Sequence, residues 1–130
     1  MFLWGALAAP VFSAGACSLV NVTLGSQLGV MIIAVGPAIE ELTKAVGISF
    51  VVMLSGEFDN STDGMVYGTA VGLGFAATEN VMYALAHATN AAAAADTLGL
   101  ILARTALSSG IHALASATVG GCLGFAYLSR

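Results

Sequence analysis

Four long apolar runs, separated by short polar stretches, organise the chain. They place helices at about residues 1–20, 26–54, 65–88 and 97–128. A membrane-spanning helix needs about 20 apolar residues, so each run is long enough to cross a bilayer once. The pattern therefore predicts an all-α fold, a polytopic transmembrane helical bundle with about four membrane helices, in a single integral membrane domain over residues 1–130.

Polar and small residues mark where these helices begin, bend and touch. Residues 55–64 are the longest polar stretch, and we expect them to form the exposed loop between the second and third helices. Ser26 is the expected N-cap of the second helix. Pro37 lies inside that helix, where the loss of a backbone hydrogen bond predicts a kink. Glycines at GxxxG spacing let helix backbones approach closely in lipid. Three such pairs occur: Gly25/Gly29, Gly68/Gly72 and Gly120/Gly124.

Composition narrows the class of protein and excludes several functions. Of the 130 residues, 58% are hydrophobic and 8% are charged, and the mean hydropathy is +0.96, which indicates an integral membrane protein without a separate soluble domain. The net charge of −4 excludes a nucleic acid partner, because no basic patch exists to hold a phosphate backbone. Cys17 and Cys122 lie in apolar runs, so we interpret them as packing residues and not as a disulfide. The sequence does not indicate an oligomeric state.

The segment Glu40-Glu41-Leu42-Thr43-Lys44 places three charges in the middle of the second apolar run. A charge at the centre of a membrane helix costs at least about 2.5–3.5 kcal/mol, so such a cluster indicates a functional site. Lys44 follows Glu40 by four residues and Glu41 by three, so it could also simply neutralise one carboxylate in a structural pair.

Counting residues inward from the membrane side shared by the second, third and fourth helices gives the depth of each polar group. At a rise of about 1.5 Å per residue, Glu40 and Glu41 lie about 21–23 Å deep and His112 about 23 Å deep. Glu79 lies about 14 Å deep and Arg104 about 10 Å deep. The depths predict a carboxylate pair facing His112, with a Glu79–Arg104 ion pair about two helical turns away.

These groups suggest three kinds of function. Glu41, Glu79 and His112 have the donor types for a Zn²⁺ ion with an open water position, although a carboxylate could also activate water as a general base without a metal. Buried Glu and His side chains also mark pathways for protons and cations, which would make the chain a non-enzymatic membrane module. A third alternative is an inactive scaffold that binds a partner helix through its glycine faces.

The motifs that carry these residues resemble those of a known family. Glu40–Lys44 reads EExxK, Gly74–Asn80 reads GFAxxEN, and Arg104 and His112 follow downstream in that order. This arrangement resembles the PrsW family of intramembrane proteases, and more distantly the CAAX prenyl endopeptidases and bacteriocin-processing proteases. The resemblance covers the second to fourth helices, about three quarters of the chain.

The resemblance implies a membrane-embedded peptidase that cleaves a membrane-anchored protein substrate within the lipid bilayer of a prokaryotic cell. It implies catalytic roles for Glu40, Glu41 and His112, the last as a metal ligand or as a donor to the oxyanion. Supporting or substrate-binding roles would fall to the remaining polar residues of the motifs, Lys44, Glu79, Asn80 and Arg104. Zn²⁺ is the candidate cofactor, and a glutamate-only mechanism would need none. Members of the family usually carry more helices, so the chain is expected to be a core or a minimal member.

Overall fold

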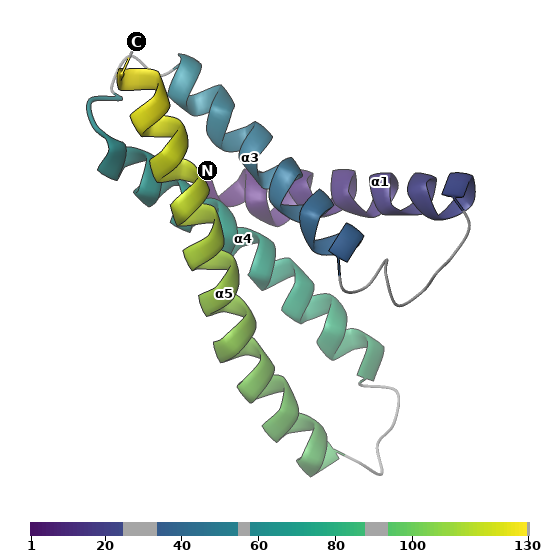
Figure 1. The fold of residues 1–130 in the computed structure, drawn as a ribbon. Helices are drawn as coiled ribbons and strands as arrows, with labels where there is room; N and C mark the ends of the chain where they lie inside the picture. The colour runs from purple at the N-terminus through teal and green to yellow at the C-terminus, as the bar shows by residue number, and fades with distance from the viewer. Residues whose placement is uncertain (25–33, 55–57, 88–93, 130) are drawn as a thin grey trace.

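The structure, a computed structural model, describes residues 1–24, 34–54, 58–87 and 94–129. Every regular element in these ranges is helical, which confirms the all-α fold. The chain begins with a short π-helical segment that leads directly into the first α-helix, and three further helices follow (Figure 1). The elements are η1 (Trp4–Ala8), α1 (Ala9–Leu24), α3 (Gly36–Leu54), α4 (Ser61–His87) and α5 (Ala94–Leu128).

Helix α4 starts earlier than the apolar pattern indicates, at Ser61 and not near residue 65. The side chains just before it explain the difference. The Asp63 carboxylate accepts hydrogen bonds from the backbone N–H groups of Asp59 and Asn60, at 3.0 and 3.1 Å, and the Asn60 side chain accepts one from the N–H of Asp63. These reciprocal bonds satisfy the free donors of a helix start, so part of the polar stretch becomes the first turn.

Pro37 lies in the first turn of α3, because α3 starts at Gly36 after a π-type turn at Ala34 and Val35. The π-helical residues run directly into α3, and residues 25–33 lie outside the described part of the chain. The kink expected at Pro37 inside a helix over residues 26–54 therefore stays a prediction. The Ser26 cap and the Gly25/Gly29 pair lie outside the described residues.

Helices α4 and α5 form a long antiparallel hairpin whose backbones touch (Figure 1). Four of their glycines, at positions 64, 68, 72 and 120, leave so little room that an added Cβ atom would collide with a backbone carbonyl of the facing helix. The close approach predicted for the glycine pairs of these helices is thus confirmed for Gly68, Gly72 and Gly120. The backbone contacts pair Gly64 with Gly120, Gly68 with Ser116, and Gly72 with His112.

The N-terminal segment joins α3 to the hairpin. The indole N–H of Trp4 donates to the carbonyl of Thr43 in α3 at 3.2 Å, and the Thr78 hydroxyl of α4 donates to the carbonyl of Ala6 at 2.5 Å. Helix α1 continues from this anchor away from the hairpin (Figure 1). A small apolar core lies where α3 meets α4, formed by Ile48, Val52, Phe58 and Val71.

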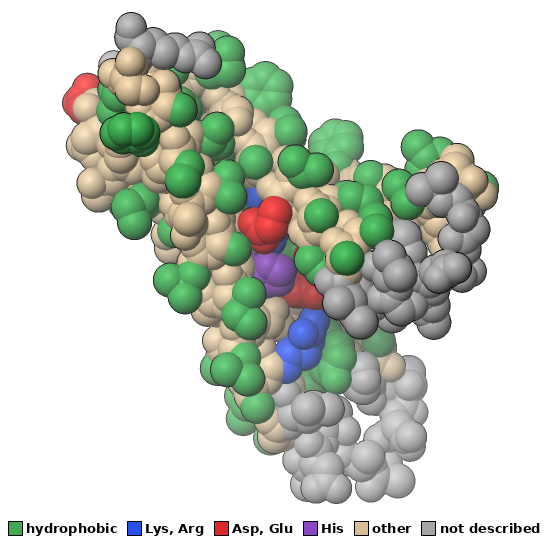
Figure 2. All heavy atoms as spheres, viewed as in Figure 1, with side chains coloured by type: hydrophobic (Ala, Val, Ile, Leu, Met, Phe, Trp, Pro, Cys, Tyr) green, Lys and Arg blue, Asp and Glu red, His purple; other side chains and the backbone are tan. Residues whose placement is uncertain are grey.

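The distribution of side chains suits a lipid environment. Lys44 and Ser116 are completely buried, whereas many large apolar side chains, such as Leu114 at 73%, are exposed. Within the described ranges, two helical segments are long and apolar enough to cross a membrane, Trp4–Thr23 and Ile101–Leu128. Figure 2 shows one face of the molecule with apolar side chains spread over it, while Glu, His and Arg side chains gather in a hollow at its middle.

Candidate active site

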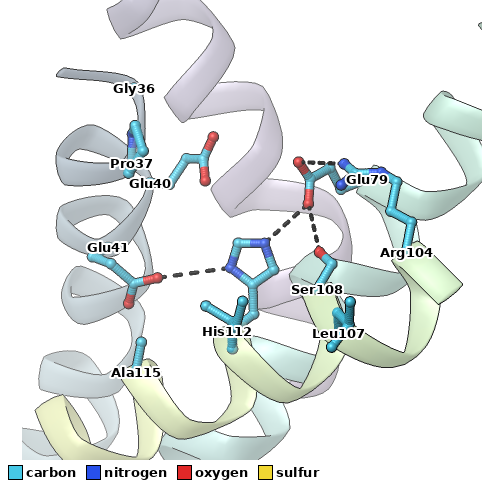
Figure 3. A pocket seen from close by; sticks show the side chains of 11 residues that line it. Gly36, Pro37, Glu40, Glu41, Glu79, Arg104, Leu107, Ser108, His112 and Ala115 are labelled. Carbon is cyan, nitrogen blue, oxygen red and sulfur yellow. Dashed lines mark hydrogen bonds and ion pairs between the residues drawn. The ribbon is translucent and has the colours of Figure 1, made fainter. Parts of the chain in front are cut away.

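The polar residues line a pocket of about 750 Å³ between the first half of α3 and the middle of α5, with Glu79 of α4 at its wall (Figure 3). The four-residue spacing along α5 turns Arg104, Ser108 and His112 toward the same side. Apart from its charged, histidine and serine side chains, the pocket is lined by apolar residues. The full lining is Gly36, Pro37, Glu40, Glu41, Glu79, Arg104, Leu107, Ser108, Ile111, His112 and Ala115.

Glu41 belongs to a tightly bonded cluster that joins α3 to α5. The Lys44 ammonium lies 2.7 Å from Oε1 of Glu41 and 2.7 Å from Nδ1 of His112. Oε1 of Glu41 is itself 3.8 Å from Nδ1, and Oε2 accepts a hydrogen bond from the Ser116 hydroxyl at 3.4 Å. Both oxygens of Glu41 are thus engaged by partners inside the protein. The Lys44 ammonium also lies over the ring of Phe75, 4.0 Å from its centroid.

Glu79 is the centre of a second cluster on the other side of the His112 ring. Its Oε2 accepts from the Ser108 hydroxyl at 3.2 Å and lies 2.9 Å from Nε2 of His112. Its Oε1 forms an ion pair with Arg104 at 2.9 Å, and the Arg104 guanidinium stacks over the Tyr83 ring at 4.5 Å. His112 therefore links the two clusters through its two ring nitrogens.

Glu40 differs from its neighbour. Its carboxylate lies on the wall of the pocket and points into it, toward the side where Glu79 lies (Figure 3). Among the described residues, no side chain forms a hydrogen bond or an ion pair with this carboxylate. Both adjacent acids line the cavity, but their contacts distinguish them: Lys44 and Ser116 hold Glu41, whereas no described side chain holds the carboxylate of Glu40.

The structure corrects the expected spacing of the polar groups. Glu79 and Arg104 form the predicted ion pair, but Glu79 also contacts His112 directly, and the pair does not lie two helical turns away. Counting residues gives the position of each Cα atom along its helix axis. Because helices tilt and these side chains are long, groups that differ in counted depth can still be in contact. Asn80 lies beside the site and not in the pocket lining, with its amide 3.4 Å from the Ser109 hydroxyl.

Two contributors were missed at the sequence level. Ser116 holds Glu41, and its place could have been read from spacing, because it continues the four-residue series of Arg104, Ser108 and His112. Phe75 supplies the ring beneath the Lys44 ammonium, and an apolar side chain in an apolar run gives no such signal.

The arrangement does not form the expected metal site. A Zn²⁺ ion needs its ligands about 2.0–2.3 Å from one point. Glu41 and Glu79 approach opposite nitrogens of His112, and the Lys44 ammonium lies between Glu41 and that ring. No three His, Cys, Asp or Glu side chains in the described part of the chain form a metal-binding group. The predicted set of Glu41, Glu79 and His112 therefore does not fit a single ion.

Three carboxylates and a histidine surround a cavity set among apolar helices, an arrangement that suits the class of membrane-embedded hydrolases. The comparisons agree. Over residues 1–130 the chain matches the family described as "PrsW family intramembrane metalloprotease". The chain belongs to this family, whose members are intramembrane proteases. The description implies a metal, which the donor arrangement above does not accommodate.

Three curated relatives, each named "Protease PrsW", are bacterial. The protein from Geobacillus kaustophilus is 38% identical over 82 residues, 63% of this chain and 32% of its own length. The one from Bacillus subtilis is 36% identical over 84 residues, 62% of this chain and 34% of its own length. The one from Oceanobacillus iheyensis is 44% identical over 45 residues, 35% of this chain and 21% of its own length. The chain thus spans about a third of the longest-matching relatives. No solved structure matches it significantly.

Proposed function

We propose that the chain is the catalytic core of an intramembrane endopeptidase that hydrolyses a peptide bond of a membrane-anchored protein. Its location would be a bacterial cell membrane, crossed by the four helical segments of the fold. Family membership and the bacterial relatives support this proposal, together with the polar pocket that opens on one face of an otherwise apolar molecule (Figure 2).

The proposal rests mainly on the carboxylate of Glu40, which lies on the pocket wall and is bonded to no side chain in the described part of the chain. A general base must reach the proton that it takes, and a carboxylate already held by internal partners is poorly placed to do so. Glu40 is free to bind a water molecule, whereas Glu41 is bonded to Lys44 and Ser116. We therefore assign Glu40 as the general base.

The reaction follows from this assignment. Glu40 takes a proton from the water, and the water oxygen forms a bond with the carbonyl carbon of the substrate. The Nε2–H of His112 lies at the pocket wall and donates to Oε2 of Glu79, so it would have to be shared between Glu79 and the oxyanion that develops, with the charge of Glu79 offset by Arg104. The C–N bond then breaks, and the proton passes from Glu40 to the leaving nitrogen. The side chain of Glu79 contacts His112, and Arg104 and Ser108 in turn bind Glu79, so these contacts fix the pocket wall beside the histidine.

The test is cleavage by the chain in liposomes. The probe is a single-span peptide of about 20 apolar residues with a fluorophore at one end and a quencher at the other. We expect Glu40→Gln to reduce the cleavage rate by about 10²–10⁴-fold, the usual contribution of a general base. Asp59→Asn, the same exchange at an exposed acid outside the pocket, should leave the rate unchanged.

Two outcomes would contradict the proposal. Full activity of Glu40→Gln would exclude Glu40 as the base. Cation flux through wild-type liposomes that depends on pH, without cleavage of the probe, would favour the non-enzymatic membrane module instead.

A separate experiment addresses the metal. Because the three donors do not converge on one point, we expect purified wild-type protein to contain well under one equivalent of zinc and to cleave the probe at an unchanged rate after dialysis against a chelator. Elemental analysis and the cleavage rate measure this. One equivalent of a divalent metal, lost together with activity in the chelator, would refute the glutamate-only mechanism.

A further inference from the structure

Lys44 is the most deeply buried charged group of the described residues, and its position is unusual because three helices meet around it. It comes from α3 and is 0% exposed. Its ammonium touches Nδ1 of His112 in α5 and Oε1 of Glu41, and it lies over the ring of Phe75 in α4. Lys44 does not line the pocket, so it has no route to the substrate.

The hydrogen-bonding capacity of these groups decides where the imidazole proton lies. An ammonium has three donors and no acceptor, so at 2.7 Å the Nδ1 atom of His112 must accept. In a neutral imidazole the proton is then on the other nitrogen. That nitrogen, Nε2, lies 2.9 Å from Oε2 of Glu79, and a carboxylate only accepts. Both sides of the ring therefore select the same tautomer.

The opposite tautomer would fail at both nitrogens. A proton on Nδ1 would face the N–H donors of Lys44, and the bare Nε2 would face a carboxylate oxygen. In a buried site each such mismatch leaves a polar group without a partner, which disfavours this tautomer. The contact with Lys44 also sets the orientation of the ring, because it exists in one ring position only.

We propose that Lys44 is a positioning residue that, together with Glu79, fixes His112 as the Nε2–H tautomer and so directs the N–H of the ring to the pocket edge. Lys44 thereby does more than neutralise Glu41. The consequence for catalysis rests on the proposed function: the Nε2–H of His112, shared with Glu79, also donates to the substrate oxygen, and the role of base is left to Glu40.

The tautomer can be observed directly, without any cleavage assay. Nitrogen-15 NMR of histidine-labelled protein in liposomes distinguishes a protonated from an unprotonated ring nitrogen. The chain has two histidines, so His87→Gln leaves the signals of His112 alone. We expect Nε2 to be protonated and Nδ1 to show the shift of a hydrogen-bonded acceptor. A protonated Nδ1 would overturn the proposal.

Removing the ammonium tests whether Lys44 is responsible. In Lys44→Met, which retains the length of the side chain, the Nδ1 signal should move to that of an unbonded acceptor or average with that of Nε2. An Nδ1 signal identical to wild type would overturn the proposal. If Lys44→Met does not fold, the double variant Lys44→Met/Glu41→Leu removes both charges together and answers the same question.

Kinetics separate positioning from mere structural support. An imidazole held in the wrong tautomer loses about 10⁴ in kcat in a serine protease, so we expect kcat for the fluorogenic probe to fall at least about 100-fold in Lys44→Met, with KM unchanged. Ile48→Ala, at an equally buried site one turn along α3, should lower stability without lowering kcat per folded molecule.

Unchanged kcat in folded Lys44→Met would overturn the positioning role of Lys44. If wild type did not cleave the probe, the proposed function would fail, while the NMR result would still decide the tautomer.

Discussion

At the scale of single residues, the adjacent acids show how one helical step separates two roles. Successive side chains on an α-helix point about 100° apart. Glu41 turns toward α5, where Lys44, His112 and Ser116 hold it, and Glu40 turns into the pocket. Glu41 is thus expected to matter for folding, and Glu40 for chemistry.

This difference predicts unequal effects of the two substitutions on stability. Glu41→Gln leaves the buried Lys44 ammonium without its anion, and breaking a buried pair in this way costs about 3–5 kcal/mol. Glu40→Gln removes no hydrogen bond or ion pair with a described side chain and should change the free energy of unfolding by less than about 0.5 kcal/mol. Thermal unfolding of both variants in the same detergent measures the contrast. Equal destabilisation would show that Glu40 also has a structural partner.

At the scale of elements, the α4–α5 hairpin is the frame on which the site is built. Glycines of α4 lie directly against the backbone of α5 at Ser116 and His112, two residues of the polar cluster. Association of helices in lipid depends on such close packing, because apolar burial gives little driving force there. The separation of these helices therefore sets the distance between Glu79 and His112.

Two glycine-to-alanine changes test this frame. In Gly68→Ala the new Cβ collides with the Ser116 carbonyl, so the hairpin must open, at a cost of about 1–3 kcal/mol. In Gly110→Ala on α5 the Cβ meets nothing, and the variant should be as stable as wild type or gain about 0.5–1 kcal/mol. Unfolding in detergent compares them. A Gly68→Ala protein as stable as Gly110→Ala would show that the helices are not in backbone contact.

At the scale of the whole molecule, the fold sets which helix ends lie together. The rings of Phe58 and Tyr127 are in contact, with centroids 6.0 Å apart, so the start of α4 and the end of α5 lie at the same end of the hairpin. The start of α5 lies at the other end (Figure 1). The polar site lies between these ends, at the level where α3 crosses the hairpin.

Single cysteines can test this topology after both native cysteines are replaced by alanine. Asp59→Cys and Ser129→Cys should react with a membrane-impermeant maleimide from the same side of sealed vesicles, because their positions share one end of the hairpin. Leu98→Cys, which is exposed near the start of α5, should react from the opposite side. Labelling of all three from one side would rule out α4 and α5 as membrane-spanning helices.

Much of this organisation could be predicted from the sequence because it depends on distance along the chain. Apolar run length predicts the helices, and residue counts bring His112 to the level of Glu41 and pair Glu79 with Arg104. The rotation of each helix about its axis depends on packing between helices that are remote in sequence. That rotation decides that Glu40 faces the pocket and that Lys44 reaches His112, so neither could be predicted.

The contact between Gly72 and the backbone of His112 has a consequence for judging which relatives are active. A chain with all the acids and the histidine but with valine in place of Gly72 would push the histidine-bearing helix outward and pull the ring away from Glu79. Every polar group would still be present in such a pseudoenzyme, and a survey of polar motifs would count it as functional. Screening of family members for activity should therefore include this glycine alongside the polar groups.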